Sequence, residues 1–133
     1  MNQSKAHLYW YLILLLLHLA HIIEEVCGRF RAIDILGSMA IFVAVNVVLF
    51  IVPIVVFIFI WRGYRRALYA GLVYAILMTL NGLGHITGYL VTGRYFGGFA
   101  GAISGIGFIL VAPLLVASLR RELHCRADKA RKE

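Results

Sequence analysis

An otherwise apolar run over residues 8–27 carries two histidines and two carboxylates near its end: His18, His21, Glu24 and Glu25. In a helix, spacings of three and seven residues put His18, His21 and Glu25 on one face. Glu24 follows His21 by three residues and borders that face. Because a charged side chain costs about 2.5–3.5 kcal/mol at the centre of a bilayer, such groups usually face a bundle interior and have a function. Imidazoles and carboxylates together can bind a metal ion, exchange protons with a substrate or relay protons.

A second polar pair lies in a later apolar segment. Asn81 and His85 are four residues apart, so they share a helical face, and Tyr89 lies one turn further along it. Glycines around His85 leave room on this helix for close packing or for a ligand.

A purely structural role must be weighed for each polar residue. A lone polar side chain inside a membrane often only joins helices by a hydrogen bond, and this is our interpretation of Asn46. The same role fits His18 as well as a functional one does. It fits Glu24 and Glu25 poorly, because two adjacent carboxylates are a costly way to join helices.

Four apolar segments must position these groups. The chain has 133 residues, of which 62% are hydrophobic, against about 45–50% in an ordinary soluble domain. The predicted membrane spans are residues 8–27, 35–61, 67–91 and 97–119. As helices rising about 1.5 Å per residue, they are long enough to cross a hydrocarbon core of about 30 Å. The sequence therefore predicts one domain, an all-α four-helix transmembrane bundle, followed by a charged tail at 120–133.

Positive charge lies between and after the apolar segments. Of the thirteen Lys and Arg residues, ten fall on the predicted face that carries both termini and three, Arg29, Arg31 and Arg94, on the other. This asymmetry puts both termini in the cytoplasm, and we expect an integral protein of a bacterial inner membrane. The net charge of +7 is not arranged as a basic stripe with aromatic residues, so we expect no nucleic-acid partner. The two cysteines, Cys27 and Cys125, fall on opposite faces and should not pair.

The predicted topology places the two polar groups at one depth. His21 lies eight residues before Arg29, and His85 lies nine residues before Arg94. Both spans run outward, so both histidines should lie in the outer half of the bilayer. Two segments far apart in the sequence are therefore predicted to form a single site.

Three kinds of chemistry fit such a site. The candidate metal ligands are His21, Glu25, His85 and His18. These residue types suit zinc or iron. Glu24 and Asn81 would then contact the ligands and not the metal itself. Without a metal, a Glu–His pair could do acid–base chemistry on an apolar substrate. The same residues could instead relay protons or ions, and a pair of haem-ligating histidines also stays open.

Small residues recur every fourth position near the end of the chain. Gly97, Gly101 and Gly105 follow this spacing, which lets helices approach closely in lipid. We therefore expect a packing face on the last span, used within the chain or in a homo-oligomer.

The motifs together resemble the HXXEE family of small integral membrane proteins. The matching segments are His21-Ile-Ile-Glu24-Glu25, Asn81-Gly-Leu-Gly-His85 and the Arg94-Tyr95 turn before a glycine-rich last span. The resemblance extends over nearly the whole chain, to about Pro113, and implies a site built from His, Glu and Asn. Family members often resemble Arg-Tyr-x-Pro-Gly at the turn, whereas this chain has Gly97 in place of the proline.

Our leading prediction is a membrane-embedded enzyme that acts on a membrane lipid or another apolar small molecule. The predicted catalytic residues are Glu24, Glu25 and Asn81, and the predicted substrate contacts are Tyr89, Arg94 and Tyr95. The alternative is a small transporter or binding protein that uses the same residues as a proton or metal relay. A scaffold that dimerises through the glycine face is a third possibility.

Overall fold

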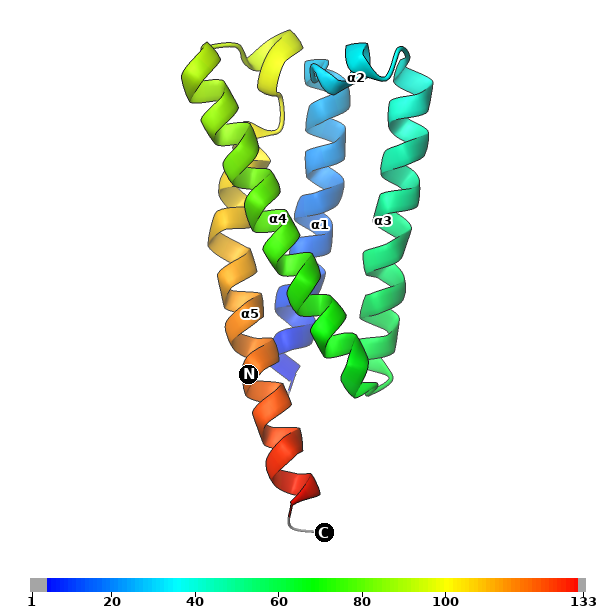
Figure 1. Cartoon of the computed structure of the whole chain (residues 1–133), viewed down its shortest axis with the longest axis vertical. Coiled ribbons are helices and arrows are strands. Elements are labelled where there is room, and N and C mark those ends of the chain that lie inside the picture. Colours follow the sequence, from blue (N-terminus) through cyan, green and yellow to red (C-terminus); the bar gives the residue numbers. More distant parts are fainter. Residues whose placement is uncertain (1–4, 132–133) are drawn as a thin grey trace.

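A computed structural model of the protein describes residues 5–131 and contains four long helices. They are α1 (Ala6–Gly28), α3 (Met39–Trp61), α4 (Arg65–Thr92) and α5 (Ala102–Ala130) (Figure 1). A short helix, α2 (Ala32–Ile35), joins α1 to α3, and one irregular helical turn, Tyr95–Phe99, joins α4 to α5. All four long helices are long and apolar enough to cross a membrane. The prediction of an all-α four-helix transmembrane bundle is confirmed.

The helices pack unequally around α1. α5 packs extensively against both α4 and α1, whereas α3 makes fewer contacts and stands to one side (Figure 1). α4 meets α3 at the turn after Trp61 and leans away from it toward the other end of the bundle. α1 begins and α5 ends at that first end, which we call the terminal end, and the α2 and Tyr95–Phe99 connections form the loop end.

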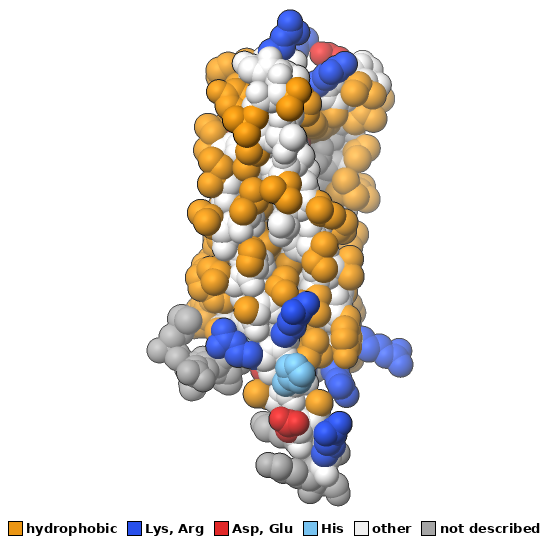
Figure 2. Space-filling model, turned by 60° about the vertical axis from the view of Figure 1, so that its left-hand side comes forward, with side chains coloured by type: hydrophobic (Ala, Val, Ile, Leu, Met, Phe, Trp, Pro, Cys, Tyr) orange, Lys and Arg blue, Asp and Glu red, His pale blue; other side chains and the backbone are white. Residues whose placement is uncertain are grey.

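The core joins α1 to the other three helices. Fully buried core side chains include Tyr11, Leu14, Leu68, Phe108 and Leu115. The Tyr11 hydroxyl donates a hydrogen bond of 3.1 Å to the backbone oxygen of Pro53 and so ties α1 to α3. Most of α3 remains exposed, as expected of a helix that faces lipid. Figure 2 shows a broad hydrophobic band, with Lys and Arg confined to the two ends of the molecule.

Two helices begin later than the sequence predicted. α3 begins at Met39 instead of residue 35, because the Ser38 side chain accepts a hydrogen bond of 3.2 Å from the Ile41 backbone N–H and caps the helix. α5 begins at Ala102 instead of residue 97, because Gly97 and Gly101 have φ angles of +65° and +112°. Proline has φ near −65°, so the proline of the Arg-Tyr-x-Pro-Gly turn could not adopt the backbone conformation of Gly97.

The predicted glycine face is therefore only partly helical. Gly97 and Gly101 precede α5, and only Gly105 of the three lies within it. Gly105 packs inside the chain against Gly82 of α4, where a Cβ added to Gly82 would lie 2.6 Å from the Gly105 oxygen. These two glycines allow α4 and α5 to touch backbone to backbone.

The charged tail predicted at 120–133 is helical over most of its length. α5 continues through Ala130. Arg126 forms an ion pair of 2.6 Å with Glu122 on the preceding turn and donates to the Gly63 oxygen in the α3–α4 connection. The end of α5 is thus attached to the terminal end of the bundle.

Candidate functional site

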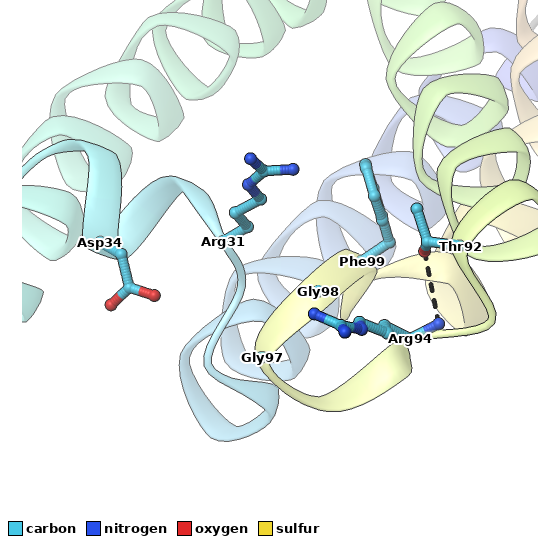
Figure 3. Close-up of a pocket in the computed structure, with 7 residues that line it drawn as sticks. All are labelled: Arg31, Asp34, Thr92, Arg94, Gly97, Gly98 and Phe99. Carbon is cyan, nitrogen blue, oxygen red and sulfur yellow. Dashed lines mark hydrogen bonds between the residues drawn. The ribbon is translucent and has the colours of Figure 1, made fainter.

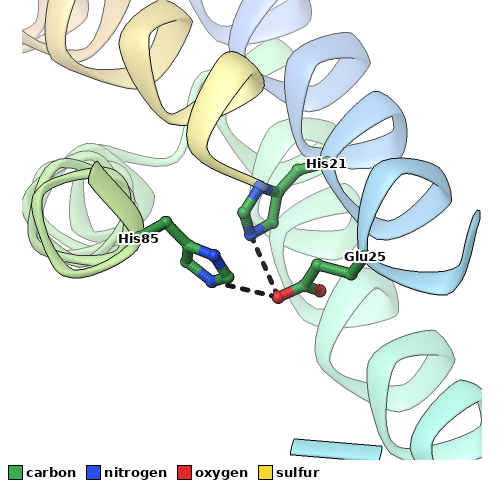
Figure 4. A group of neighbouring side chains, drawn as sticks. All are labelled: His21, Glu25 and His85. Atoms are coloured by element: carbon green, nitrogen blue, oxygen red, sulfur yellow. Dashed lines mark ion pairs between the residues drawn. The ribbon is translucent and has the colours of Figure 1, made fainter. Parts of the chain in front are cut away.

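A buried group of two histidines and one carboxylate lies in the half of the bundle near the loop end. His21 and Glu25 extend from α1, and His85 extends toward them from α4 (Figure 4). Glu25 Oε1 is 3.4 Å from His21 Nε2 and 3.1 Å from His85 Nε2. The three residues are only 2–5% exposed. The prediction that His21 and His85 come together is confirmed by this buried group.

Gly101 brings the start of α5 against both imidazoles. A Cβ added to Gly101 would lie 2.6 Å from His21 Cε1 and 2.7 Å from His85 Nδ1. Its φ of +112° also lies in the region that favours glycine. Gly101 therefore allows the chain to cover the site, a role different from the helix packing that its spacing suggested.

Two polar side chains contact His21 from α4 and α5. Asn81 Nδ2 lies 3.0 Å from His21 Nε2, and Ser104 Oγ lies 2.8 Å from His21 Nδ1. Asn81 was predicted from the sequence, but Ser104 was missed. A serine near the start of an apolar helix carries no spacing signal, and only the folded chain brings it to His21.

Glu24 lies in a different environment from Glu25. Its carboxylate accepts hydrogen bonds from the Ser104 and Tyr95 hydroxyls and from the backbone N–H groups of Ile103 and Ser104, the latter two at 3.0 and 2.9 Å. A carboxylate at a helix N-terminus is favourable, because the first N–H groups of the helix lack partners within it. Glu24 thus anchors the start of α5 and does not face the two imidazoles.

The hydrogen bonds of Ser104 determine which nitrogen of His21 carries a proton. The single hydroxyl hydrogen of Ser104 points to an oxygen, either of Glu24 or of Gly101, so Ser104 Oγ must accept a hydrogen bond from His21 Nδ1–H. In a neutral imidazole, the Nε2 lone pair then accepts a hydrogen bond from Asn81 Nδ2 at 3.0 Å, and Nε2 also lies 3.4 Å from Glu25 Oε1. A proton or a metal ion on Nε2 in place of the Asn81 hydrogen bond would make the contact with Glu25 attractive.

His85 has one nitrogen facing Glu25 and one without a partner. Its Nδ1 is buried and forms no hydrogen bond within the described part of the chain. A buried nitrogen lone pair is less costly to leave unpaired than a buried N–H group. Without an ion, His85 Nε2–H therefore donates to Glu25. The Phe30 ring covers the imidazole, with its centre 4.4 Å from that of His85.

Two other polar residues lie outside this group. His18 Nδ1 is 3.1 Å from the Tyr74 hydroxyl, so His18 joins α1 to α4 and is not among the three clustered ligands. Asn46 donates a hydrogen bond of 3.0 Å to the Phe42 oxygen of its own helix. The interpretation of Asn46 as a contact between helices is therefore not supported.

The three predicted substrate contacts are at the loop end. Tyr95 donates to Glu24, and its ring packs edge-on against Tyr89 with centres 6.1 Å apart. Burial, together with the hydrogen bond to Glu24, raises the pKa of Tyr95 to about 12, so its hydroxyl stays a donor at neutral pH. Arg94 lines a separate polar cavity. Tyr95 thus reaches the site only through Glu24 and Ser104.

An apolar groove of about 760 Å³ leads to the clustered residues. Its walls come from α3 and α4, its back comes from α1, and it reaches His21, Glu25 and Asn81. Wall residues such as Leu49 and Val73 are 57% and 56% exposed, so the groove opens sideways between α3 and α4. Both helices are long and apolar enough to span a membrane, and in a membrane this opening would face lipid.

Comparison of the chain with known protein families, curated proteins and solved structures gave no match. The resemblance to the HXXEE family therefore stays a prediction.

Proposed function

We propose that this protein is a membrane-embedded enzyme that acts on a lipid or another apolar molecule at a metal ion held by His21, Glu25 and His85. One observation carries the proposal: an apolar groove that opens toward lipid ends at a buried group of two imidazoles and a carboxylate. A substrate could therefore reach the ligands without leaving the hydrocarbon region.

The spacing of the ligand atoms supports a single zinc or iron ion. Ligand atoms about 2.1 Å from a tetrahedral zinc ion lie about 3.4 Å apart. The Glu25 oxygen is 3.4 Å from one imidazole nitrogen and 3.1 Å from the other. Both imidazoles approach the same oxygen, which favours one ion over a haem, whose axial ligands lie on opposite sides of a flat ring. When bound, such an ion polarises a carbonyl or lowers the pKa of a bound water.

The surrounding residues would hold the reacting groups in place. Ser104 fixes His21 with its Nε2 lone pair toward the ion, as the partners of metal-bound histidines commonly do. Asn81 lies where the groove meets His21 and would orient the polar part of a substrate. The aliphatic walls of α3 and α4 would hold its hydrocarbon part and exclude water.

Metal content tests the proposal directly. Elemental analysis of detergent-purified protein should find about one equivalent of zinc or iron, lost in His21→Ala and His85→Ala. His124→Ala is the matched control, since His124 is exposed on α5 and should leave the metal in place. An absorption spectrum checks for haem. Wild-type protein without zinc, iron or haem would contradict the metal site and favour acid–base catalysis by Glu25 and its histidines.

A hydrogen-bonded series supports a second candidate function, a proton relay in a small transporter. It runs from Tyr95 through Glu24 and Ser104 to His21, joining the loop end to the site. Glu25→Gln separates the two functions in reconstituted vesicles. Loss of turnover with substrate binding kept supports the enzyme. A changed pH dependence of ion flux supports the relay.

A further inference from the structure

A polar cavity of about 460 Å³ lies at the loop end of the bundle. Arg31 and Asp34 line it from the α1–α3 connection, and Thr92, Arg94 and residues 97–99 line it from the α4–α5 connection (Figure 3). Two segments far apart in the sequence thus supply one guanidinium group each.

The two arginines lack a carboxylate partner. Within the described residues, neither Arg31 nor Arg94 forms an ion pair, and Asp34 lines the cavity without pairing with either. The charged side chains around the cavity therefore sum to one positive charge, two arginines against one aspartate. An anion is the ligand that this balance favours.

Backbone hydrogen bonds hold the two arginine segments together. The Arg31 N–H donates to the Gly98 oxygen at 3.0 Å, and the Phe99 N–H donates to the Arg94 oxygen at 3.0 Å. The positive φ of Gly97 allows the tight turn between them. Both arginines therefore extend from backbone that is already held in place before a ligand binds.

Two phenylalanine rings separate the polar cavity from the clustered histidines. Phe99 lines the cavity, Phe30 lines the apolar groove, and their ring centres are 6.2 Å apart. Phe30 packs directly on His85. Glu25 lies three residues before Gly28, the last residue of α1, which corresponds to about 4.5 Å of helix. The clustered residues thus lie within about one helical turn of the end of α1, and Arg31 of the polar cavity follows that end by three residues.

On the basis of the proposed function, we infer that the substrate is an anionic lipid. Its phosphate headgroup binds Arg31 and Arg94, and its hydrocarbon chain lies in the groove between α3 and α4. The bonds that join headgroup and chain then lie beside the clustered histidines. Guanidinium groups suit this headgroup because their planar N–H groups bind phosphate oxygens in pairs.

Native mass spectrometry with phosphatidylglycerol tests this inference. The purified protein in neutral detergent should bind one such lipid per chain. Arg31→Gln and Arg94→Gln should each weaken binding about tenfold or more, since each removes charge-assisted hydrogen bonds. Arg29→Gln is the matched control, because Arg29 is exposed at the same end but does not line the cavity. Equal weakening in all three variants would indicate surface charge alone and overturn the inference.

Inorganic phosphate distinguishes a lipid from a free anion. Phosphate alone should compete with phosphatidylglycerol only weakly, because it lacks the chain that fills the groove. Competition at matched concentrations would overturn the lipid assignment.

The metal content of the arginine variants separates this inference from the proposed function. Arg31→Gln and Arg94→Gln should keep the metal that His21→Ala loses. Arginine variants that bind the lipid as wild type does, while His21→Ala still loses metal, would overturn this inference and leave the proposed function standing. The wild-type protein could instead hold no metal while the arginine variants still bind the lipid more weakly than it does. That result would support the headgroup site and contradict the metal site.

Discussion

Two adjacent glutamates have different neighbours at the scale of single residues. Glu24 accepts hydrogen bonds from three donors at the start of α5 and from the Tyr95 hydroxyl, whereas Glu25 faces two imidazoles. Ser104 connects the two environments, since its hydroxyl group contacts Glu24 and accepts a hydrogen bond from His21. One hydroxyl group thus contacts both the carboxylate that anchors α5 and an imidazole of the clustered residues.

We expect Ser104→Ala to lower zinc affinity by about 10–100-fold, the usual effect of removing a hydrogen-bond partner of a metal ligand. Without the hydroxyl, His21 is no longer held with its Nε2 lone pair toward the ion. Competition with a chelating dye measures the affinity. Ser118→Ala is the control, because Ser118 is also a buried serine of α5 but donates only to the Leu115 oxygen. An equal loss in both variants would contradict the role of Ser104.

Glu24→Gln and Glu25→Gln should have opposite effects on stability and metal content. Glu24→Gln weakens charge-assisted hydrogen bonds that hold α5, so it should lower the free energy of unfolding by roughly 1.5–3 kcal/mol. Glu25→Gln should instead lose the metal and unfold near the temperature of the metal-free wild-type protein, because only the stabilisation by the bound ion is lost. Thermal unfolding by circular dichroism, with elemental analysis, checks both. The two roles would be refuted if Glu24→Gln lost the metal at unchanged stability.

Close contact between α4 and α5 is the main feature at the scale of the helices. Gly82 and Gly105 let the two backbones touch, and Gly101 brings the chain before α5 over the histidines. α3 packs less closely, which leaves the apolar groove between α3 and α4. The tight pair of helices holds the site, and the looser pair provides access to it.

Gly82→Ala should destabilise the bundle by about 1–3 kcal/mol, because its methyl group would lie 2.6 Å from a backbone oxygen of α5. Gly84→Ala is a closely matched control two residues further along α4, with nothing within 4 Å of its added Cβ. It should be neutral or stabilise the helix by up to about 1 kcal/mol. Thermal unfolding in detergent compares them, and equal melting temperatures would argue against this helix contact.

Charge is distributed unequally over the whole molecule. Arg29, Arg31 and Arg94 belong to the connections at the loop end, and the cationic residues of α5 lie at the terminal end with the turn after Trp61. Figure 2 shows Lys and Arg at both ends of the molecule. The positive-inside rule therefore predicts a cytoplasmic terminal end.

Thiol labelling of intact cells checks this orientation. Cys125 is exposed on α5, so in a Cys27→Ser variant a membrane-impermeant maleimide should label it only after the cells are opened. The exposed Phe96 at the loop end provides a labelling position for the other membrane face. Phe96→Cys in a chain without the native cysteines should be labelled in intact cells. Labelling of Cys125 in intact cells, with no labelling of the Phe96→Cys variant, would show the opposite topology.

The sequence by itself determined the helical architecture and the meeting of the two histidines. Hydropathy adds up along the chain, so four apolar segments of sufficient length predict four membrane-spanning helices without knowledge of their packing. Helical spacing and the direction of each span place His21 and His85 at one height. These properties are local or depend on simple counts of residues, which is why His21, Glu25 and His85 could be predicted to meet.

Only the tertiary structure decided which neighbours these residues have. Ser104 is 83 residues from His21 in the sequence, and their contact depends on the positive φ of Gly101, which spacing does not reveal. His18 shares a helical face with His21, yet it forms a hydrogen bond with Tyr74 and does not join the group of His21, Glu25 and His85. The groove depends on how far α3 and α4 separate. Such contacts depend on backbone turns and crossing angles, which no pattern along a single helix encodes.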